Sequence, residues 1–210
     1  MIYLIITTSI NNRYGPYDLN ERKNRYLFAI KETLQKLPCE IKPIIVENNG
    51  ERETYLDNFY HNGERVKVFY TNNNEQQFKS KGINEFIDIK EIINRYGIDD
   101  DDIIIKLTGR YRALTPNFFK DIIENENNYD GFIKFFGACS LKFEEYDCIL
   151  GCYALRTKYF KLFNHLSINN YKSAEIAFAR YVKFSYIRLK EVENLDIECS
   201  FSENLRIINV

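Results

Sequence analysis

The segment from Lys106 to Tyr111, KLTGRY, brings together residue types that bind phosphate oxygens. It follows the apolar residues 103–105, which predict a buried strand ending near this segment. Side-chain alternation along a strand places Lys106, Thr108 and Arg110 on one face. Arginine offers a planar fork of donors and lysine a point charge. Two cations and a hydroxyl that converge at a strand end suit a diphosphate.

The same two cations also have an explanation that involves no ligand. A lysine inside so apolar a strand is costly unless it finds a partner. Lys106 and Arg110 could therefore pair with carboxylates such as Glu47 or Glu85. Gly109 favours the ligand interpretation, because a glycine permits a bend and a close approach. We expect these cations to neutralise a phosphate-bearing leaving group.

Four consecutive aspartates, Asp99 to Asp102, are the other conspicuous charged feature. Carboxylates of this kind can hold a divalent cation such as Mn²⁺ or Mg²⁺. They precede their strand, however, and ligands of parallel sheets lie outside the carboxyl ends of the strands. A solvated turn between a helix and a strand is the favoured interpretation, and metal binding by this run is the weaker alternative. The sequence therefore leaves the metal site unassigned.

Apolar runs alternate with helical patterns along the first half of the chain, which predicts parallel β-α-β units. The expected strands are residues 2–8, 41–46, 66–70 and 103–107, and the expected helices are residues 21–36, 52–60 and 81–95. Each strand ends in a polar segment: Thr7-Thr8-Ser9, Glu47-Asn48-Asn49-Gly50, Thr71-Asn72-Asn73-Asn74 and Thr108-Gly109-Arg110-Tyr111. We expect these four ends to gather at one edge of the sheet.

The second half is less regular. It predicts helices over residues 116–126, 157–166 and 173–184, strands over 132–136 and 148–155, and a strand and tail over 198–210. No internal repeat, low-complexity tract or proline-rich linker interrupts the 210 residues, so a single domain is expected. The predicted fold class is α/β, with a mixed, mainly parallel sheet flanked by helices.

Composition excludes several classes of protein. The net charge of −1 provides no general field for nucleic acid or anionic lipid. No apolar stretch is long enough to span a membrane, and the start lacks the features of a signal peptide. Five cysteines in an apparently non-secreted chain indicate free thiols in a reducing, cytoplasmic compartment. His61 and His165 are isolated, so a structural zinc site is disfavoured.

The strand-end segments, together with Lys81-Gly82-Ile83-Asn84-Glu85, resemble those of small GT-A-fold glycosyltransferases. Similar chains occur in giant DNA viruses and in bacterial capsule or lipopolysaccharide clusters. The resemblance is best over residues 1–112, which it implies are the nucleotide-sugar-binding half. Residues 113–210 would be the acceptor-binding and catalytic half. The implied localisation is cytoplasmic, in the host cytoplasm for a viral protein.

The resemblance implies transfer of a sugar from a UDP, GDP or dTDP donor to a glycan hydroxyl. Donor-binding positions carried over are Thr7, Thr8, Ser9, Glu47, Asn48, Lys81, Gly82, Lys106, Thr108, Gly109, Arg110 and Tyr111. Simple strand capping, a turn, or a surface lysine could also explain the positions before Lys106. The chain lacks the Asp-x-Asp that commonly follows the fourth strand, which puts dependence on a divalent metal in doubt.

Glu175 is the first candidate for the general base, because Ser173 can cap a helix with this residue in its first turn. The helix dipole alone also favours a glutamate there. Asp130 is the second catalytic candidate, and Asp147 is another acid to test. The expected acceptor-binding residues are Tyr153 and Arg156, with Tyr171 as a further aromatic contact.

Two other functions remain open on the sequence. One is nucleotidyl transfer on a similar sheet, which calls for a glycine-rich phosphate loop after the first strand; residues 7–12 contain no glycine. The other is a non-catalytic module that binds a nucleotide or a sugar.

Overall fold

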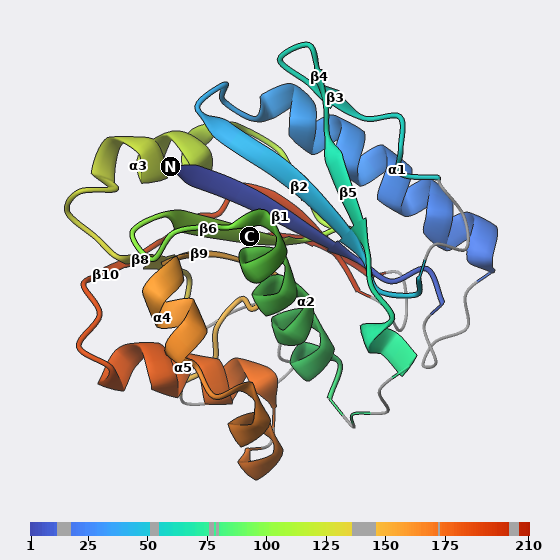
Figure 1. The fold of residues 1–210 in the computed structure, drawn as a ribbon. Coiled ribbons are helices and arrows are strands. Elements are labelled where there is room, and N and C mark those ends of the chain that lie inside the picture. The colour runs from blue at the N-terminus through green and yellow to red at the C-terminus, as the bar shows by residue number, and fades with distance from the viewer. Residues whose placement is uncertain are drawn as a thin grey trace.

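The apolar runs of the sequence form a central sheet. The computed structural model describes residues 1–11, 18–50, 55–75, 78, 80–135, 146–171, 173–201 and 206–210. In this part of the chain, seven strands form one sheet in the order β10-β8-β9-β6-β1-β2-β5 (Figure 1). The strands are β1 (Ile2–Thr8), β2 (Ile41–Glu47), β5 (Lys67–Tyr70), β6 (Ile103–Thr108), β8 (Gly131–Ile133), β9 (Cys152–Arg156) and β10 (Leu189–Glu191).

Five α-helices are seen in the described ranges. They are α1 (Leu19–Lys36), α2 (Lys81–Tyr96), α3 (Asn117–Asn125), α4 (Thr157–Leu162) and α5 (Ala174–Phe184), with 3-10 helices η1 (Asn73–Glu75) and η2 (His165–Asn170). The side chain of Asp18 caps α1 by accepting from the amide of Asn20, and Gly97 ends α2 in the left-handed conformation. The predicted α/β class, with helices flanking a mainly parallel sheet, is confirmed.

Strands β1, β2, β5 and β6 run parallel, and β9 runs antiparallel to both β6 and β8. The register aligns Thr8 with Glu47 and Glu47 with Tyr70, while Thr7 aligns with Thr108. The polar strand ends therefore gather at one edge, as the alternation of strands and helices predicts. We call this edge the strand-end rim. Strands from both halves of the chain share the sheet.

The sheet is buried on both faces, and its strands alternate between two apolar cores. Ile2, Leu4 and Ile6 of β1 face the core that α1 and α3 cover. Tyr3 and Ile5 face the core that α2, α4 and α5 cover. Figure 1 shows the two helix layers on either side of the sheet. Such two-sided burial explains why β1 and β6 are nearly continuous apolar runs.

A small antiparallel sheet packs beside α1. It has the order β12-β11-β7 and contains β7 (Arg112–Ala113), β11 (Ile197–Ser200) and β12 (Ile207–Asn209). The amide of Ala113 donates to the hydroxyl of Thr33 on α1 at 3.1 Å. This sheet brings the end of the chain next to the segment that follows β6.

Several expected elements differ from those in the structure. Residues 51–54 lie outside the described part, residues 55–58 form turns, and Tyr60 begins the hairpin of β3 (Tyr60–His61) and β4 (Glu64–Arg65). A helix over residues 52–60 is therefore wrong where the structure can be compared. The strands expected over 132–136 and 148–155 shorten to β8 and β9, with an isolated bridge between Phe135 and Cys148. Phe136 lies outside the described residues.

Candidate functional site

The end of β2 is tied to the end of β1 by the carboxylate of Glu47, which is only 1% exposed. Its Oε1 accepts hydrogen bonds from the amides of Ile10 and Asn49 and from the Asn49 side chain, at 2.8 to 3.2 Å. Its Oε2 accepts from the hydroxyls of Thr8 (2.9 Å) and Tyr55 (2.7 Å). Five donors occupy the roughly four acceptor positions of a carboxylate. Glu47 thus holds the loop together, which corrects its expected role in contacting a nucleobase.

A second buried carboxylate, Asp88 on α2, holds the ends of β2 and β5. It accepts hydrogen bonds from Asn48 (3.0 Å), Thr71 (2.9 Å) and Asn73 (2.8 Å). Burial is the main cause that raises the pKa of Asp88 to about 7. The three hydrogen bonds oppose this rise, and the nearby charge of Glu85 contributes to it. The side-chain amide of Asn48 therefore already donates a hydrogen bond to a carboxylate of the protein itself.

Lys106 is buried in the sheet, with 1% exposure, on the face that α2 covers. Its ammonium pairs with Glu85 of α2 at 2.7 Å and donates to the Thr108 hydroxyl (2.6 Å) and the Leu150 carbonyl (3.0 Å). Three partners match the three donors of an ammonium. Lys106 therefore fits the carboxylate-pairing alternative, and its ammonium has no donor left for a ligand, whereas the Thr108 hydroxyl keeps its own donor.

Arg110 lies beyond the end of β6 and has other hydrogen-bond partners than Lys106. Strand β6 ends at Thr108, and residues 109–110 form a turn, so the alternation that would align the two cations does not continue. Arg110 donates through Nε to the carbonyl of Ser200 (3.2 Å), and it lies near both Tyr26 of α1 and Glu85 of α2. The two cations therefore do not share a hydrogen-bond partner, although Glu85 pairs with Lys106 and lies near Arg110.

Arg110 stays partly exposed at the strand-end rim, and Gly109 holds it close to β1. A Cβ atom on Gly109 would lie 2.7 Å from Cγ2 of Thr8 and 3.0 Å from Cδ1 of Tyr26. The Gly109 amide also donates to the carbonyl of Thr7 at 2.8 Å. A side chain at position 109 would therefore clash with β1 and α1, whereas the close approach of a ligand that Gly109 permits stays a prediction.

The expected donor-binding residues at the end of β1 lie together. The Thr7 hydroxyl is buried and has no hydrogen-bond partner within the described ranges. The Ser9 hydroxyl accepts from the side chain of Asn49 at 3.2 Å. Tyr111 is buried over Gly151, where a Cβ atom would lie 2.0 Å from its ring. Its ring therefore packs inside the protein.

Gly82 at the start of α2 packs against α5. A Cβ atom here would lie 2.5 Å from that of Ala174, so the first turns of the two helices touch. The side chain of Lys81 lies outside what the structure describes. This contact brings Glu175, the next residue of α5, toward the strand-end rim. Asp147, which accepts from the amide of Cys148, is on the same side, because β9 runs antiparallel to β6 and begins at this edge.

Three other expected site residues lie elsewhere. Asp130 and Arg156 form an ion pair at 2.8 Å at the amino end of β6, where Arg156 is in register with Ile103. The six residues of β6 separate that edge from the rim by about 17 Å. Tyr153 is 1% exposed and stacks on Phe160 in the core. The expected catalytic role of Asp130 and the acceptor-binding roles of Arg156 and Tyr153 are therefore corrected to structural ones.

The electrostatics of Asp130 agree with a structural role. Its hydrogen bond from Arg188 is the main cause that lowers the pKa of Asp130 to about 2; burial opposes this effect, and Arg156 adds to it. A carboxyl group with so low a pKa is a weak proton acceptor near neutral pH.

The aspartate run forms the predicted turn between α2 and β6. Asp99, Asp100 and Asp101 are exposed, and Asp102 pairs with the amino group of Met1 at 2.6 Å. Among the described residues, no group of three or more His, Cys, Asp or Glu side chains could hold a metal ion. Glu47 and Asp88, the buried acids of the rim, already accept hydrogen bonds from the protein. These residues do not fit a divalent metal held by carboxylates.

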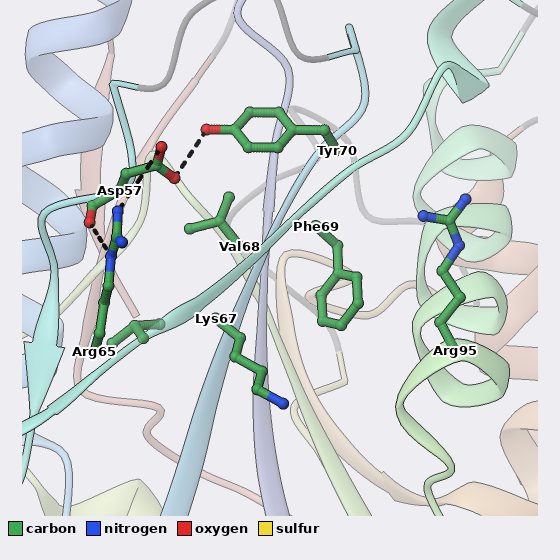
Figure 2. A pocket seen from close by; sticks show the side chains of 8 residues that line it. Asp57, Arg65, Lys67, Val68, Phe69, Tyr70 and Arg95 are labelled. Atoms are coloured by element: carbon green, nitrogen blue, oxygen red, sulfur yellow. Dashed lines mark hydrogen bonds and ion pairs between the residues drawn. The ribbon is translucent and has the colours of Figure 1, made fainter.

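A surface groove of about 640 Å³ runs along β5, at the open side of the sheet (Figure 2). It is lined by Asp57, Arg65, Val66, Lys67, Val68, Phe69, Tyr70 and Arg95. Arg65 donates to the carbonyl of Asp57 at 2.7 Å, and the Tyr70 hydroxyl donates to its carboxylate at 3.3 Å. The groove follows the side of the sheet and does not reach Arg110.

Two residues near the rim are not among the site residues expected from the sequence. Arg22 and Tyr26 lie one turn apart on α1 and contact the end of β1, as described below. The signal that could have found them is helical periodicity. Arg22 is the first member of the i, i+4 series that continues with Tyr26, Ile30 and Leu34, so it is a charged residue on the buried stripe of the helix.

Comparisons with known proteins identify the fold. No family model and no curated protein sequence matches the chain. Among solved structures, a protein of Desulfovibrio desulfuricans assigned as a nucleotide-diphospho-sugar transferase aligns with a TM-score of 0.57 at 10% identity, over 91% of this chain and 79% of that one. CMP:2-keto-3-deoxy-manno-octonic acid synthetase, complexed with CTP, aligns at 0.54 and 13% identity, over 91% and 89%.

The glycosyltransferase GlyE of Streptococcus pneumoniae aligns with a TM-score of 0.51 at 7% identity. The alignment covers 91% of this chain and 45% of GlyE, and for the bifunctional IspDF of Campylobacter jejuni the chain spans 49% of that protein. The fold is therefore that of nucleotide-diphospho-sugar transferases. In the described residues, no helix combines the length and the apolar character that a membrane span needs.

Proposed function

We propose that this protein is a glycosyltransferase that moves a sugar from a nucleoside-diphosphate donor to a glycan hydroxyl. The observation that carries the proposal is Arg110, a partly exposed arginine at the end of β6 that forms no ion pair with a carboxylate in the described part of the chain. It lies beside Gly109, where a Cβ atom would clash with Thr8 at the end of β1. In open α/β sheets this is the edge where ligands bind.

Arg110 would neutralise the diphosphate as it leaves. During transfer the bond between the anomeric carbon and the diphosphate oxygen breaks, and the electron pair stays on the nucleoside diphosphate. A planar guanidinium can donate two parallel hydrogen bonds to such phosphate oxygens and stabilise the developing charge. The hydroxyls of Thr7 and Ser9, at the end of β1, would contact the nucleoside.

Glu175 would accept the proton of the attacking hydroxyl in an inverting reaction. Its helix begins with Ser173, whose hydroxyl accepts from the amide of Ile176 at 3.2 Å, so Glu175 lies in the first turn. The contact between Ala174 and Gly82 places this turn next to α2 at the rim. The new bond joins the acceptor oxygen to the anomeric carbon, and the proton passes to the carboxylate.

Nucleotidyl transfer is the second candidate, supported by the fold of the CTP-bound synthetase. The two reactions break different bonds. Glycosyl transfer releases a nucleoside diphosphate, whereas nucleotidyl transfer from a nucleoside triphosphate to a sugar phosphate releases pyrophosphate. The absence of glycine from residues 7–12 argues against a glycine-rich phosphate loop after β1.

The test is to incubate the protein with a panel of UDP-, GDP- and dTDP-sugars, with and without Mn²⁺ or Mg²⁺, and to measure the released nucleoside diphosphate. A parallel panel of nucleoside triphosphates with sugar phosphates measures pyrophosphate. Release of a nucleoside diphosphate supports the proposal. Release of pyrophosphate alone would assign nucleotidyl transfer, and binding without turnover would identify a non-catalytic module.

A further inference from the structure

Arg22 is a buried arginine that has no acidic partner in the part of the chain that the structure describes. It lies in the first turns of α1, near the end of β1, and is 5% exposed. Its Nε donates to the carbonyl of Ser9 at 2.7 Å, and its Nη2 donates to the hydroxyl of Tyr26 at 3.0 Å. Its Nη1 is buried and has no hydrogen-bond partner in the described residues. A buried guanidinium in this condition is costly.

The hydroxyl of Tyr26 accepts a hydrogen bond from Arg22 at 3.0 Å and lies near Arg110. It also accepts from the Ser9 amide at 3.2 Å, and it donates to the Ser9 carbonyl. A phenol has one donor and two acceptor positions. Nη2 of Arg22 and the Ser9 amide therefore fill both acceptor positions, and the hydroxyl offers none to Arg110 or to Nη1 of Arg22. The cluster has more donors than acceptors, and an anion would supply the missing acceptors.

Neighbouring arginines show how the same protein satisfies a guanidinium that serves structure. Arg25, three residues after Arg22, pairs with Glu198 at 2.7 Å, and Arg112 pairs with the same carboxylate at 2.7 Å. Neither Arg22 nor Arg110 has such a partner within the described ranges. Arg22 and Arg110 therefore differ from Arg25 and Arg112, because no carboxylate in the described ranges neutralises them. Two arginines near one tyrosine that lack such a carboxylate are what an anion-binding site needs.

We propose that Arg22, Tyr26 and Arg110 form a binding site for a phosphate or diphosphate group. Arg22 would then be the second cation of the site, the role that the sequence predicts for Lys106. The assignment deepens the proposed function, on which it rests, by naming the residues that recognise the diphosphate. The ligand is a dianionic phosphate group, free or carried by a nucleotide. Its oxygens would accept from Arg110 and from the unused Nη1 of Arg22.

The test measures binding of inorganic pyrophosphate, UDP, GDP and the nucleoside uridine by calorimetry. The variants are Arg22→Met, Arg22→Lys and Tyr26→Phe. The matched control is Arg95→Met, because Arg95 is an exposed arginine on α2 that pairs with Glu91. We expect both Arg22 variants to weaken pyrophosphate or nucleotide binding at least about tenfold, Tyr26→Phe to weaken it less, and the control to bind as the wild type does.

Tighter binding of a nucleoside diphosphate than of pyrophosphate would identify the nucleotide as the source of the phosphate, and equal binding would identify the free anion. Full affinity in Arg22→Lys and Arg22→Met, or no binding of any phosphate compound by the wild type, would overturn the inference. Unfolding temperature gives a second readout. Arg22→Met should keep or raise it, because an unpaired buried charge is removed, whereas a structural arginine would lower it.

The two proposals fail in different ways. Arg22-dependent pyrophosphate binding without turnover of any nucleotide sugar would leave the site standing and refute glycosyl transfer. If Arg22→Met turned over a nucleotide sugar at the wild-type rate, glycosyl transfer would stand and the proposed phosphate site at Arg22 would be refuted.

Discussion

Replacing Lys106 with methionine separates a structural lysine from a ligand-binding one. The change removes an ammonium with three partners and leaves the Glu85 charge, the Thr108 hydroxyl and the Leu150 carbonyl without their donor. Breaking a buried ion pair costs about 3–5 kcal/mol. The Glu85 side chain is 28% exposed, so water offsets part of this cost. We expect a loss of about 3 kcal/mol in the free energy of unfolding.

The assay is urea unfolding of Lys106→Met, Glu85→Gln and the double variant. For a chain of this length, the expected loss corresponds to a fall of about 9 °C in the unfolding temperature. Glu85→Gln should cost less, because the amide still accepts from Lys106. The two changes should be non-additive by about 1 kcal/mol or more, because the residues are in contact.

The reasoning would be refuted if Lys106→Met unfolded at the wild-type urea concentration and yet lost nucleotide binding. That result would return Lys106 to the donor-binding role that the sequence suggests.

Three further predictions concern other residues of the rim. The pKa of Asp88, about 7 when folded against 3.8 unfolded, means that its contribution to stability is complete below pH 4 and is lost as the pH rises through 7. Asp88→Asn should remove up to about 4 kcal/mol of that pH dependence, and parallel unfolding profiles of the two proteins between pH 4 and 8 would contradict this. Gly109→Ala should lower the free energy of unfolding by about 2 kcal/mol, because its Cβ would clash with Thr8 and Tyr26; an unchanged urea midpoint would show that the junction can widen. Glu175→Gln should lower the transfer rate at least about a hundredfold with unchanged donor affinity, and full turnover would remove Glu175 from the mechanism.

The order of strands and helices was predictable because it depends on local patterns. Continuous apolar runs such as residues 2–8 and 103–107 marked strands buried on both faces, and the parallel arrangement followed from the helices between them. The gathering of Thr8, Glu47 and Thr108 at one edge then followed from the direction of the strands.

The partners of the charged residues were not predictable in the same way. The direction of the Arg110 side chain depends on where β6 ends, and side-chain alternation does not continue through the turn at residues 109–110. Asp130 and Arg156 were given site roles although β8 and β9 place them at the opposite edge, because the direction of β9 follows from long-range pairing that one sequence does not show. The role of Arg22 was not predictable, because it depends on which atoms surround its guanidinium in the folded protein.

The most direct test of the account is the binding of UDP, GDP and dTDP to the wild type, Arg110→Ala and Arg95→Ala. We predict that the wild type and the Arg95 variant bind at least one of these diphosphates with a dissociation constant below about 1 mM, and that Arg110→Ala loses this binding. A wild-type protein that binds none of the three, or an Arg110→Ala variant that binds as tightly as the wild type, would show that Arg110 does not hold a nucleoside diphosphate.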